Sequence, residues 1–147
     1  MAETRWAESS WSGDLIGGAG SIDYVSSGSV SRLPVTWSSR TEAANGRTSP
    51  EEMVAAAHSS CFSMAFANGL AKAGHAPERL TVRASVSAEK REAGWTVISS
   101  AITVRGRVPG IGAADFKRLA EEAKENCPIS RAIKGNVELS VEATLES

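Results

Sequence analysis

The segment from residue 49 to residue 74 is the longest helical signal in the chain, and between its first and last turns it has no acidic or basic residue. Ser49 followed by Glu52 forms a capping-box pattern, and Pro50 suits a helix start. Gly74 is typical of the position just after a helix end. A helix without a charged face is expected to be buried. The sequence therefore predicts a long buried central helix around which the other elements pack.

Cys61 lies in the middle of this helix, one turn after His58. A free cysteine usually behaves as a small apolar residue, so a structural role is the first interpretation. Mid-helix, the thiol gains no help from a helix N-terminus, and burial raises a thiol pKa. Cys61 therefore needs a nearby cation in order to react. Arg40 is a better candidate than His58 because it is always charged and carries a fork of donors.

The rest of the chain reads as strands, with one amphipathic helix. The element order is βββ-α-ββ-α-β, which predicts an α+β fold: an antiparallel sheet with the helices on one side. A chain of 147 residues is expected to form a single domain, residues 1–147. The expected segments are three short strands within 1–36 with a break at 17–20, a polar loop at 41–48, a hairpin of 80–88 and 95–108 with a polar turn at 89–94, a helix at 113–126, a helical turn at 127–133 and a strand at 137–145.

A second cysteine, Cys127, follows the amphipathic helix and precedes Pro128, so it stands at the head of the next helical turn. A helix N-terminus favours the thiolate form of a cysteine. Two cysteines in such positions suggest a peroxidatic and resolving pair. One thiolate reacts with a peroxide to give a sulfenic acid, and the other condenses with it to a disulfide.

Composition narrows the possible partners and location. The net charge is −1 and no basic run alternates with aromatic residues, so we expect no nucleic-acid partner. No uninterrupted apolar run reaches the length of a membrane span, and we expect no membrane association. The first residues lack a signal-peptide core, which predicts a cytoplasmic protein. In a reducing compartment, a cysteine pair is more often catalytic, redox-active or metal-binding than a permanent disulfide.

Several motifs resemble those of one family, the OsmC/Ohr thiol-dependent organic hydroperoxide reductases. Residues 50–65 resemble its central-helix motif, and the form of residues 58–64 is closer to the OsmC branch. Residues 127–130, Cys-Pro-Ile-Ser, resemble its second-cysteine motif. Residues 11–15 and 33–40 resemble its N-terminal motifs, although Trp-Ser at positions 37 and 38 departs from the usual pattern.

This resemblance implies an assignment of roles. Cys61 is the peroxidatic cysteine, Cys127 the resolving cysteine, Arg40 the catalytic arginine and Glu51 the glutamate that orients it. The implied protein is a peroxiredoxin-type antioxidant enzyme of the oxidative and osmotic stress responses. It reduces organic hydroperoxides to alcohols through a redox-active disulfide, which is reset by a dithiol reductant such as a lipoylated protein. The resemblance implies an intertwined homodimer with active sites at the interface, and neither a cofactor nor a metal.

Spacing along the central helix supports the dimer independently. Glu51 and Cys61 are ten residues apart, which separates them by about 15 Å along a helix axis and points them to different faces. Two copies of the helix crossing antiparallel near Ala56 bring Glu51 of one copy beside Cys61 of the other. Such a crossing is an isologous contact, and small alanine side chains permit it. We therefore expect composite sites, with Arg40 and Glu51 donated across the interface.

Apolar residues near the expected site suggest the substrate class. A thiolate lined by apolar side chains should prefer a peroxide with an apolar tail, so we expect organic hydroperoxides to react better than hydrogen peroxide. The residues expected to line the pocket are Phe62, Met64, Phe116 and Ile129.

Three other interpretations stay open at this point. A metal site could use Cys61, Cys127, His58 and His75, but no C-x-x-C spacing is present. A Cys-His hydrolase could use His58 as its base, although nothing evident orients that residue. We prefer a core or interface histidine with one hydrogen bond for His58. The third alternative is a non-catalytic ligand-binding or stress-response protein, against which the combination of arginine, glutamate and two cysteines argues.

Overall fold

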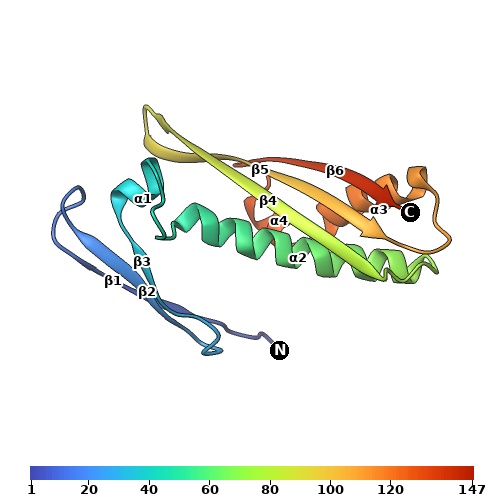
Figure 1. Ribbon diagram of the computed structural model, residues 1–147, viewed down its shortest axis with the longest axis horizontal. Coiled ribbons are helices and arrows are strands. Elements are labelled where there is room, and N and C mark those ends of the chain that lie inside the picture. The colour runs from blue at the N-terminus through green and yellow to red at the C-terminus, as the bar shows by residue number, and fades with distance from the viewer. The chain divides into compact units, whose positions relative to one another are not determined.

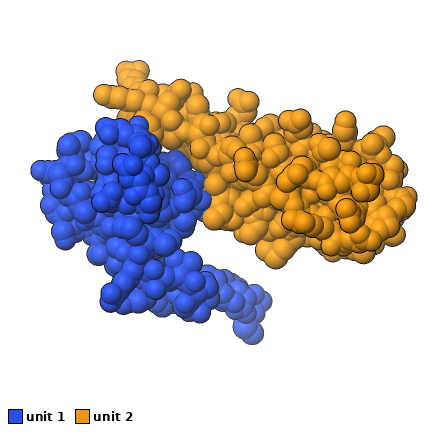
Figure 2. Space-filling view, viewed as in Figure 1, with its two compact units in different colours: residues 1–53 blue, residues 54–147 orange.

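The computed structural model describes all residues from Met1 to Ser147. The chain divides into two compact units, Met1–Met53 and Val54–Ser147, which are coloured separately in Figure 2. The expectation of a single domain stays a prediction. No helix combines the length and the hydrophobicity needed to cross a membrane.

The first unit contains a three-stranded antiparallel sheet (Figure 1). Its strands are β1 (Ala7–Ser12), β2 (Ala19–Val25) and β3 (Ser31–Val35), in the order β1-β2-β3. The three expected strands are present. However, β2 begins inside the glycine-rich segment 17–20 that we expected to be a break. Every residue of β1 is exposed, so this sheet has little buried apolar surface of its own.

A short helix follows that the sequence analysis did not predict. Helix α1 spans Trp37–Thr41, where we expected no helix and placed the start of a polar loop at residue 41. Thr36 and Ser39 form a reciprocal capping box: the Ser39 N–H donates to Thr36 Oγ1 at 3.1 Å, and the Thr36 N–H donates to Ser39 Oγ at 3.0 Å. Serine is uncommon in the second role, which is why the Thr-x-x-Ser spacing was missed.

Helix α2 spans Pro50–Lys72, close to the predicted central helix. Only half of the expected capping box forms. Ser49 Oγ accepts the Glu52 N–H at 3.2 Å, but the Glu52 carboxylate accepts from the Thr48 hydroxyl at 3.2 Å. Gly74 ends the helix at φ +87°, which an L side chain rarely adopts.

The prediction that this helix is buried all round is wrong for the single chain. One face is buried, whereas the side chains of Ala56, Ala57, Ser60 and Met64 are exposed. Absence of charge indicated burial correctly on one face only.

The second unit contains another three-stranded sheet, in the order β4-β5-β6. Strands β4 (Arg79–Arg91) and β5 (Gly94–Arg107) form an antiparallel hairpin. Strand β4 ends three residues later than predicted and β5 begins one residue earlier, so the expected turn at 89–94 shrinks to Glu92 and Ala93. Strand β6 (Glu138–Glu146) pairs with β5 in parallel, which corrects the expectation of a purely antiparallel sheet.

The parallel pairing follows from the connection between β5 and β6. The chain crosses from one end of the sheet to the other through helices α3 (Ala113–Asn126) and α4 (Pro128–Ile133). These two helices match the predicted helix and the predicted helical turn. The α+β class is confirmed.

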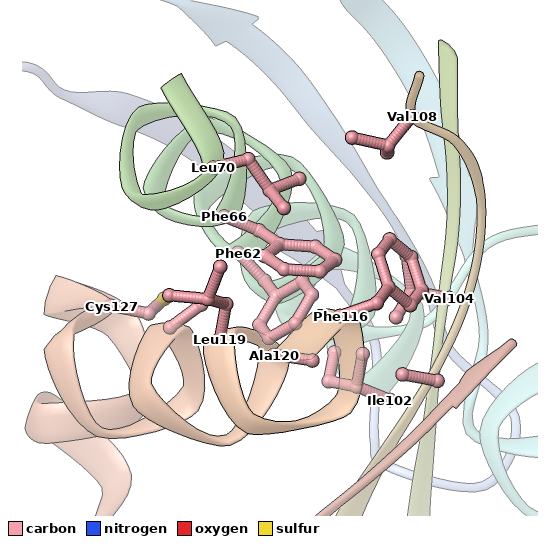
Figure 3. Packing of buried hydrophobic residues seen from close by; sticks show 12 residues of the cluster. Phe62, Phe66, Leu70, Ile102, Val104, Val108, Phe116, Leu119, Ala120 and Cys127 are labelled. Carbon is pink, nitrogen blue, oxygen red and sulfur yellow. The ribbon is translucent and has the colours of Figure 1, made fainter. Parts of the chain in front are cut away.

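Aromatic and aliphatic side chains from α2, α3 and the β5 region form one buried cluster (Figure 3). The Phe66 ring lies 5.0 Å from the Phe116 ring and 5.6 Å from the Phe62 ring, between centroids. All three rings are fully buried. This core fixes α2 against α3, and it therefore fixes the two segments that carry the cysteines.

Candidate active site

The two cysteines meet in the second unit. Cys61 is carried by α2 and is partly exposed, whereas Cys127 lies between α3 and α4 and is fully buried. Both are free thiols, and each sulfur acts on the pKa of the other, so the two side chains are neighbours. Figure 3 shows Cys127 at the edge of the buried cluster, on the side of α3 and α4. Two neighbouring thiols form a dithiol that an oxidant can convert to a disulfide.

Burial raises the pKa of the Cys61 thiol. The backbone N–H of Ile129 and the charge of Arg131 act in the opposite direction, while the neighbouring Cys127 raises the pKa further. The net upward shift agrees with the expectation for a thiol in the middle of a helix. Within this unit, Cys61 therefore lacks a partner strong enough to make it a ready thiolate.

Burial also acts to raise the pKa of Cys127, but hydrogen bonding outweighs it, and the pKa lies below its ordinary value. The groups that lower the pKa are the backbone N–H of Ser130, the thiol of Cys61, the hydroxyl of Ser130 and the backbone N–H of Ile129. Three of these groups belong to the first turn of α4, and the direction of the shift agrees with the expected preference for thiolate at this helix N-terminus.

A groove beside α2 gives access to Cys61. Its volume is about 770 Å³, and Cys61, Met64 and Pro128 are among the residues that line it. Phe62 and Phe116 do not line it, because both are fully buried in the core. The expectation that they form the substrate pocket is therefore wrong. Both residues were assigned on hydrophobicity alone, which does not distinguish a core position from a pocket wall.

His58 is fully buried, and both of its ring nitrogens are hydrogen-bonded. Nδ1 lies 2.6 Å from Ser100 Oγ on β5, and Nε2 lies 2.8 Å from Ser130 Oγ on α4. Burial lowers the pKa of the His58 imidazole, which is therefore neutral. We expected a core histidine with one hydrogen bond, and the structure gives it two. Since both nitrogens are bonded to serines, His58 is not placed as the base of a Cys-His hydrolase.

The sequence analysis did not identify Ser100 as a partner of His58. A signal was present, since Ser100 lies at an inward-facing position of β5, two residues before the buried Ile102. A polar side chain on the buried face of a strand needs a hydrogen-bond partner.

Arg40 and Glu51 meet in the first unit. Arg40 Nε donates to Glu51 Oε1 at 2.9 Å and to Oε2 at 3.2 Å, and its Nη2 lies 2.8 Å from Oε1. The guanidinium also lies over the Trp37 ring, 5.7 Å from the centroid. A fork on both carboxylate oxygens fixes the plane of the guanidinium.

Local structure explains this placement. Arg40 lies in the last turn of α1, and Glu51 in the first turn of α2. The Ser39 hydroxyl donates to the Thr48 carbonyl at 2.9 Å and so ties α1 to the segment that enters α2. The unpredicted helix α1 is thus the element that brings the arginine to the glutamate.

A mainly apolar cavity of about 440 Å³ lies in the same unit. Its lining includes Trp11, Leu15, Ile22, Trp37 and the side chain of Arg40. An apolar wall with one cation suits an apolar molecule that carries a polar or anionic end.

The residues of the metal-site interpretation are not gathered for coordination. No group of three or more His, Cys, Asp or Glu side chains is arranged to hold a metal ion. The imidazole Nδ1 of His75 lies 3.4 Å from the Pro109 carbonyl oxygen. The structure brings the expected site residues together as two pairs, Cys61 with Cys127 and Arg40 with Glu51, each within one unit.

Comparison with known proteins relates the chain to one family. Residues 43–142 match the family model described as OsmC-like protein. The chain is 35% identical over 139 residues to peroxiredoxin OsmC of Escherichia coli strain K12, covering 95% of this chain and 96% of that protein. It is 28% identical over 100 residues to an organic hydroperoxide resistance protein of Xanthomonas axonopodis pv. citri, covering 64% of this chain and 65% of that protein.

Solved structures of similarly named proteins have a similar fold. An organic hydroperoxide resistance protein from Elizabethkingia anophelis superposes with a TM-score of 0.72 at 24% identity, covering 98% of this chain and all of that chain (100%).

Proposed function

This chain belongs to the OsmC-like family, and on that premise we propose that it is a thiol-dependent peroxidase that reduces organic hydroperoxides to alcohols. The names of its relatives, a peroxiredoxin and organic hydroperoxide resistance proteins, support a redox role that involves hydroperoxides.

The observation that carries the proposal is that the two neighbouring thiols differ in exposure to solvent. Cys61 faces a groove and can meet a peroxide, whereas Cys127 is fully buried. The pKa values alone favour Cys127 as the thiolate. A nucleophile must nevertheless reach its substrate, so accessibility assigns Cys61 as the peroxidatic residue and Cys127 as the resolving residue.

The proposed cycle has three steps. The Cys61 thiolate attacks one peroxide oxygen, the O–O bond breaks, and the alkoxide takes up a proton and leaves as an alcohol. The Cys127 thiolate then attacks the sulfur of the Cys61 sulfenic acid, the S–O bond breaks, and hydroxide leaves as water after protonation. A dithiol reductant, which we infer to be a small dithiol or a lipoylated protein, reduces the disulfide by exchange and becomes a cyclic disulfide itself.

Arg40 supplies the cation that Cys61 lacks in its own unit. A guanidinium lowers the pKa of a neighbouring thiol and can also donate a hydrogen bond to a peroxide oxygen. In this proposal Glu51, which is paired with Arg40, orients the guanidinium both toward the thiol and toward the peroxide oxygen.

The arginine reaches the thiol across a homodimer interface. Exposed small side chains at Ala56, Ala57 and Ser60 give α2 a face on which a second copy can pack closely. Exposed apolar side chains in the first unit, including Trp6, Trp11, Leu15 and Ile16, also suit a subunit interface.

The first test compares peroxides and cysteine variants. With a dithiol reductant in excess, the wild-type protein should consume cumene hydroperoxide faster than hydrogen peroxide, because the apolar tail can be desolvated in an apolar site. Cys61→Ser should abolish turnover. Cys127→Ser should still form a sulfenic acid that dimedone traps at Cys61. A folded, fully reduced wild-type protein that consumes neither peroxide would overturn the proposal and favour a binding role.

Subunit mixing tests the composite site. Near pH 7, Cys61→Ser should be inactive alone and Arg40→Ala should be strongly impaired, yet each heterodimer of the two variants should contain one intact site. Mixed dimers, purified through two different affinity tags, should recover about half of the activity per dimer on this statistical argument. Mixed dimers no more active than the Arg40→Ala parent would contradict donation of Arg40 across the interface.

A further inference from the structure

Beside the cysteine pair, the structure contains a buried chain of hydrogen bonds that the proposed cycle does not use. It runs from Ser100 on β5 through His58 on α2 to Ser130 on α4, and the Ser130 hydroxyl also acts on the Cys127 thiol. Ser100, His58 and Cys127 are fully buried, and Ser130 is 1% exposed. No water can therefore substitute for these contacts without a rearrangement of the core.

The direction of each hydrogen bond in this series follows from the Cys127 sulfur at its end. A hydroxyl has one proton, and a thiolate can only accept, so Ser130 must donate its proton to Cys127 when Cys127 is ionised. Ser130 Oγ must then accept from His58 Nε2–H, and the unprotonated Nδ1 accepts from the Ser100 hydroxyl. Every atom in this arrangement has a partner, in agreement with the absence of buried side-chain nitrogen or oxygen atoms without one.

We propose that His58 and Ser130 are positioning residues for the resolving cysteine: His58 holds the Ser130 hydroxyl toward the Cys127 sulfur and so prepares Cys127 as the nucleophile that closes the disulfide. This inference rests on the proposed function, and it assigns a role within the resolving step. In this step the S–S bond forms, the S–O bond of the sulfenic acid breaks, and the hydroxide leaves as water after protonation.

A buried thiolate needs such help because removing a charge from water is costly unless the charge is hydrogen-bonded. The start of α4 supplies backbone N–H groups from Ile129 and Ser130, and the Ser130 hydroxyl adds a side-chain donor. The charged groups that act on the two sulfurs are the sulfurs themselves and Arg131 on α4. A neutral His58 fixes the hydroxyl without adding a buried charge of its own.

The direct test is the titration of Cys127 in a protein whose only thiol is Cys127. In the Cys61→Ser background, thiolate absorbance at about 240 nm needs no reagent to enter the core. The spectrum of Cys61→Ser/Cys127→Ser is subtracted at each pH, because it contains the same tyrosine. Ser130→Ala and His58→Leu should each raise the titration midpoint by about one pH unit, the effect of one lost hydrogen bond to a charged group.

Two further variants separate positioning from general stability. Ser100→Ala removes the other partner of His58 and should lower the melting temperature while leaving the midpoint within error, because it leaves the donor Nε2–H in place. His58→Gln retains an amide donor, so it should raise the titration midpoint less than His58→Leu does. If Ser130→Ala and His58→Leu lower stability but titrate like their parent, the network is only structural and the proposal fails.

The rate of disulfide closure links the titration to the reaction. After one equivalent of cumene hydroperoxide, Ser130→Ala in the otherwise wild-type chain should close the disulfide about threefold more slowly at neutral pH. A tenfold smaller thiolate fraction is partly offset by the greater nucleophilicity of a more basic thiolate. Raising the pH above the new midpoint should remove the deficit. Closure at the wild-type rate at every pH would overturn the proposal.

These measurements distinguish the two levels of inference. If the wild-type protein fails to react with any peroxide, the proposed function fails, but the titration still reports whether His58 and Ser130 act on the Cys127 sulfur. If the wild-type protein turns over normally and the variants neither titrate nor close differently, only the positioning role is lost.

Discussion

The side chains of Cys61 and Cys127 are neighbours, yet their pKa values move in opposite directions. Burial acts against the thiolate at both positions. At Cys127 the start of α4 and the Ser130 hydroxyl overcome it, whereas at Cys61 the donors nearby do not. The accessible sulfur is thus the less acidic one, so a peroxidatic role for Cys61 requires a nearby cation, which we propose to be Arg40.

This requirement predicts how the reaction of Cys61 depends on pH. In a Cys127→Ser background, the rate of sulfenic acid formation should reach its plateau at a lower pH with Arg40 than in Arg40→Ala. Without the cation, burial keeps the Cys61 pKa above its ordinary value, so less thiolate is present at neutral pH. The rate should fall about 10- to 100-fold near pH 7, and the deficit should shrink as the pH rises through the thiol range.

Stopped-flow measurement with cumene hydroperoxide from about pH 6 to pH 10 would show this profile. Arg47→Ala is the matched control, because Arg47 is an exposed arginine of the same unit and should leave the profile unchanged. A deficit in Arg40→Ala that is constant across the pH range would indicate that Arg40 orients the peroxide without changing the ionisation of Cys61.

Residue types and positions singled out Cys61 and Cys127 in the sequence, whereas the roles of Arg40 and Glu51 came from the resemblance to the OsmC/Ohr family. Neither was enough to find the partners of His58. Ser100 and Ser130 lie 42 and 72 residues from His58 along the chain, and their meeting depends on how α2, β5 and α4 pack. No local pattern encodes such a contact, so the buried network needed the structure.

At the scale of elements, periodicity located the helices and strands well and their ends less well. The hairpin of β4 and β5 extends almost to its two-residue turn because strand pairing there outweighs the polarity of residues 89–91. The direction of β6 could not be read from its alternation, since a half-buried strand looks the same in parallel and antiparallel pairing. The crossover through α3 and α4 determines it.

The packing of α3 on β5 predicts a sharp difference between two glycines. A Cβ at Gly106 would lie 2.7 Å and 2.8 Å from ring atoms of Phe116 and 2.9 Å from Leu80 Cδ2. The Phe116 ring is itself held against Phe66 and cannot move freely. Gly106→Ala should therefore lower the free energy of unfolding by about 1–3 kcal/mol.

Gly69→Ala is the matched control on α2, because a Cβ there meets nothing within 4 Å. It should stabilise the protein by about 0.5–1 kcal/mol, since alanine favours the helix interior more than glycine does. Urea unfolding of both variants provides the comparison. Equal stability of Gly106→Ala and the wild type would show that the contact between α3 and β5 is looser than the structure indicates.

At the scale of the whole molecule, apolar side chains are distributed unequally between the two compact units. The second unit has a continuous buried cluster, whereas the sheet of the first unit leaves β1 exposed along its length. A three-stranded sheet with little buried surface is marginal by itself. The sequence predicted the strands of this sheet correctly, but strand periodicity does not say what covers a sheet.

The position of the two cysteines along the chain also has a topological consequence. A Cys61–Cys127 disulfide would join α2 to the start of α4 and convert the chain between them into a covalent ring that contains β4, β5 and α3. Closing a ring of about 65 residues removes conformational freedom from the unfolded chain, and in the chain-entropy description this stabilises the folded state by about 4 kcal/mol.

The oxidised intermediate of the cycle should therefore resist unfolding better than the reduced enzyme. Urea titrations of diamide-oxidised and reduced protein should give a higher midpoint for the oxidised form, and Cys127→Ser should show no such difference. An oxidised form that unfolds at the same or a lower urea concentration would mean that closing the ring strains α2 or α4. Each turnover would thus alternate the chain between a linear and a cyclic topology, with the reductant returning it to the more easily unfolded form.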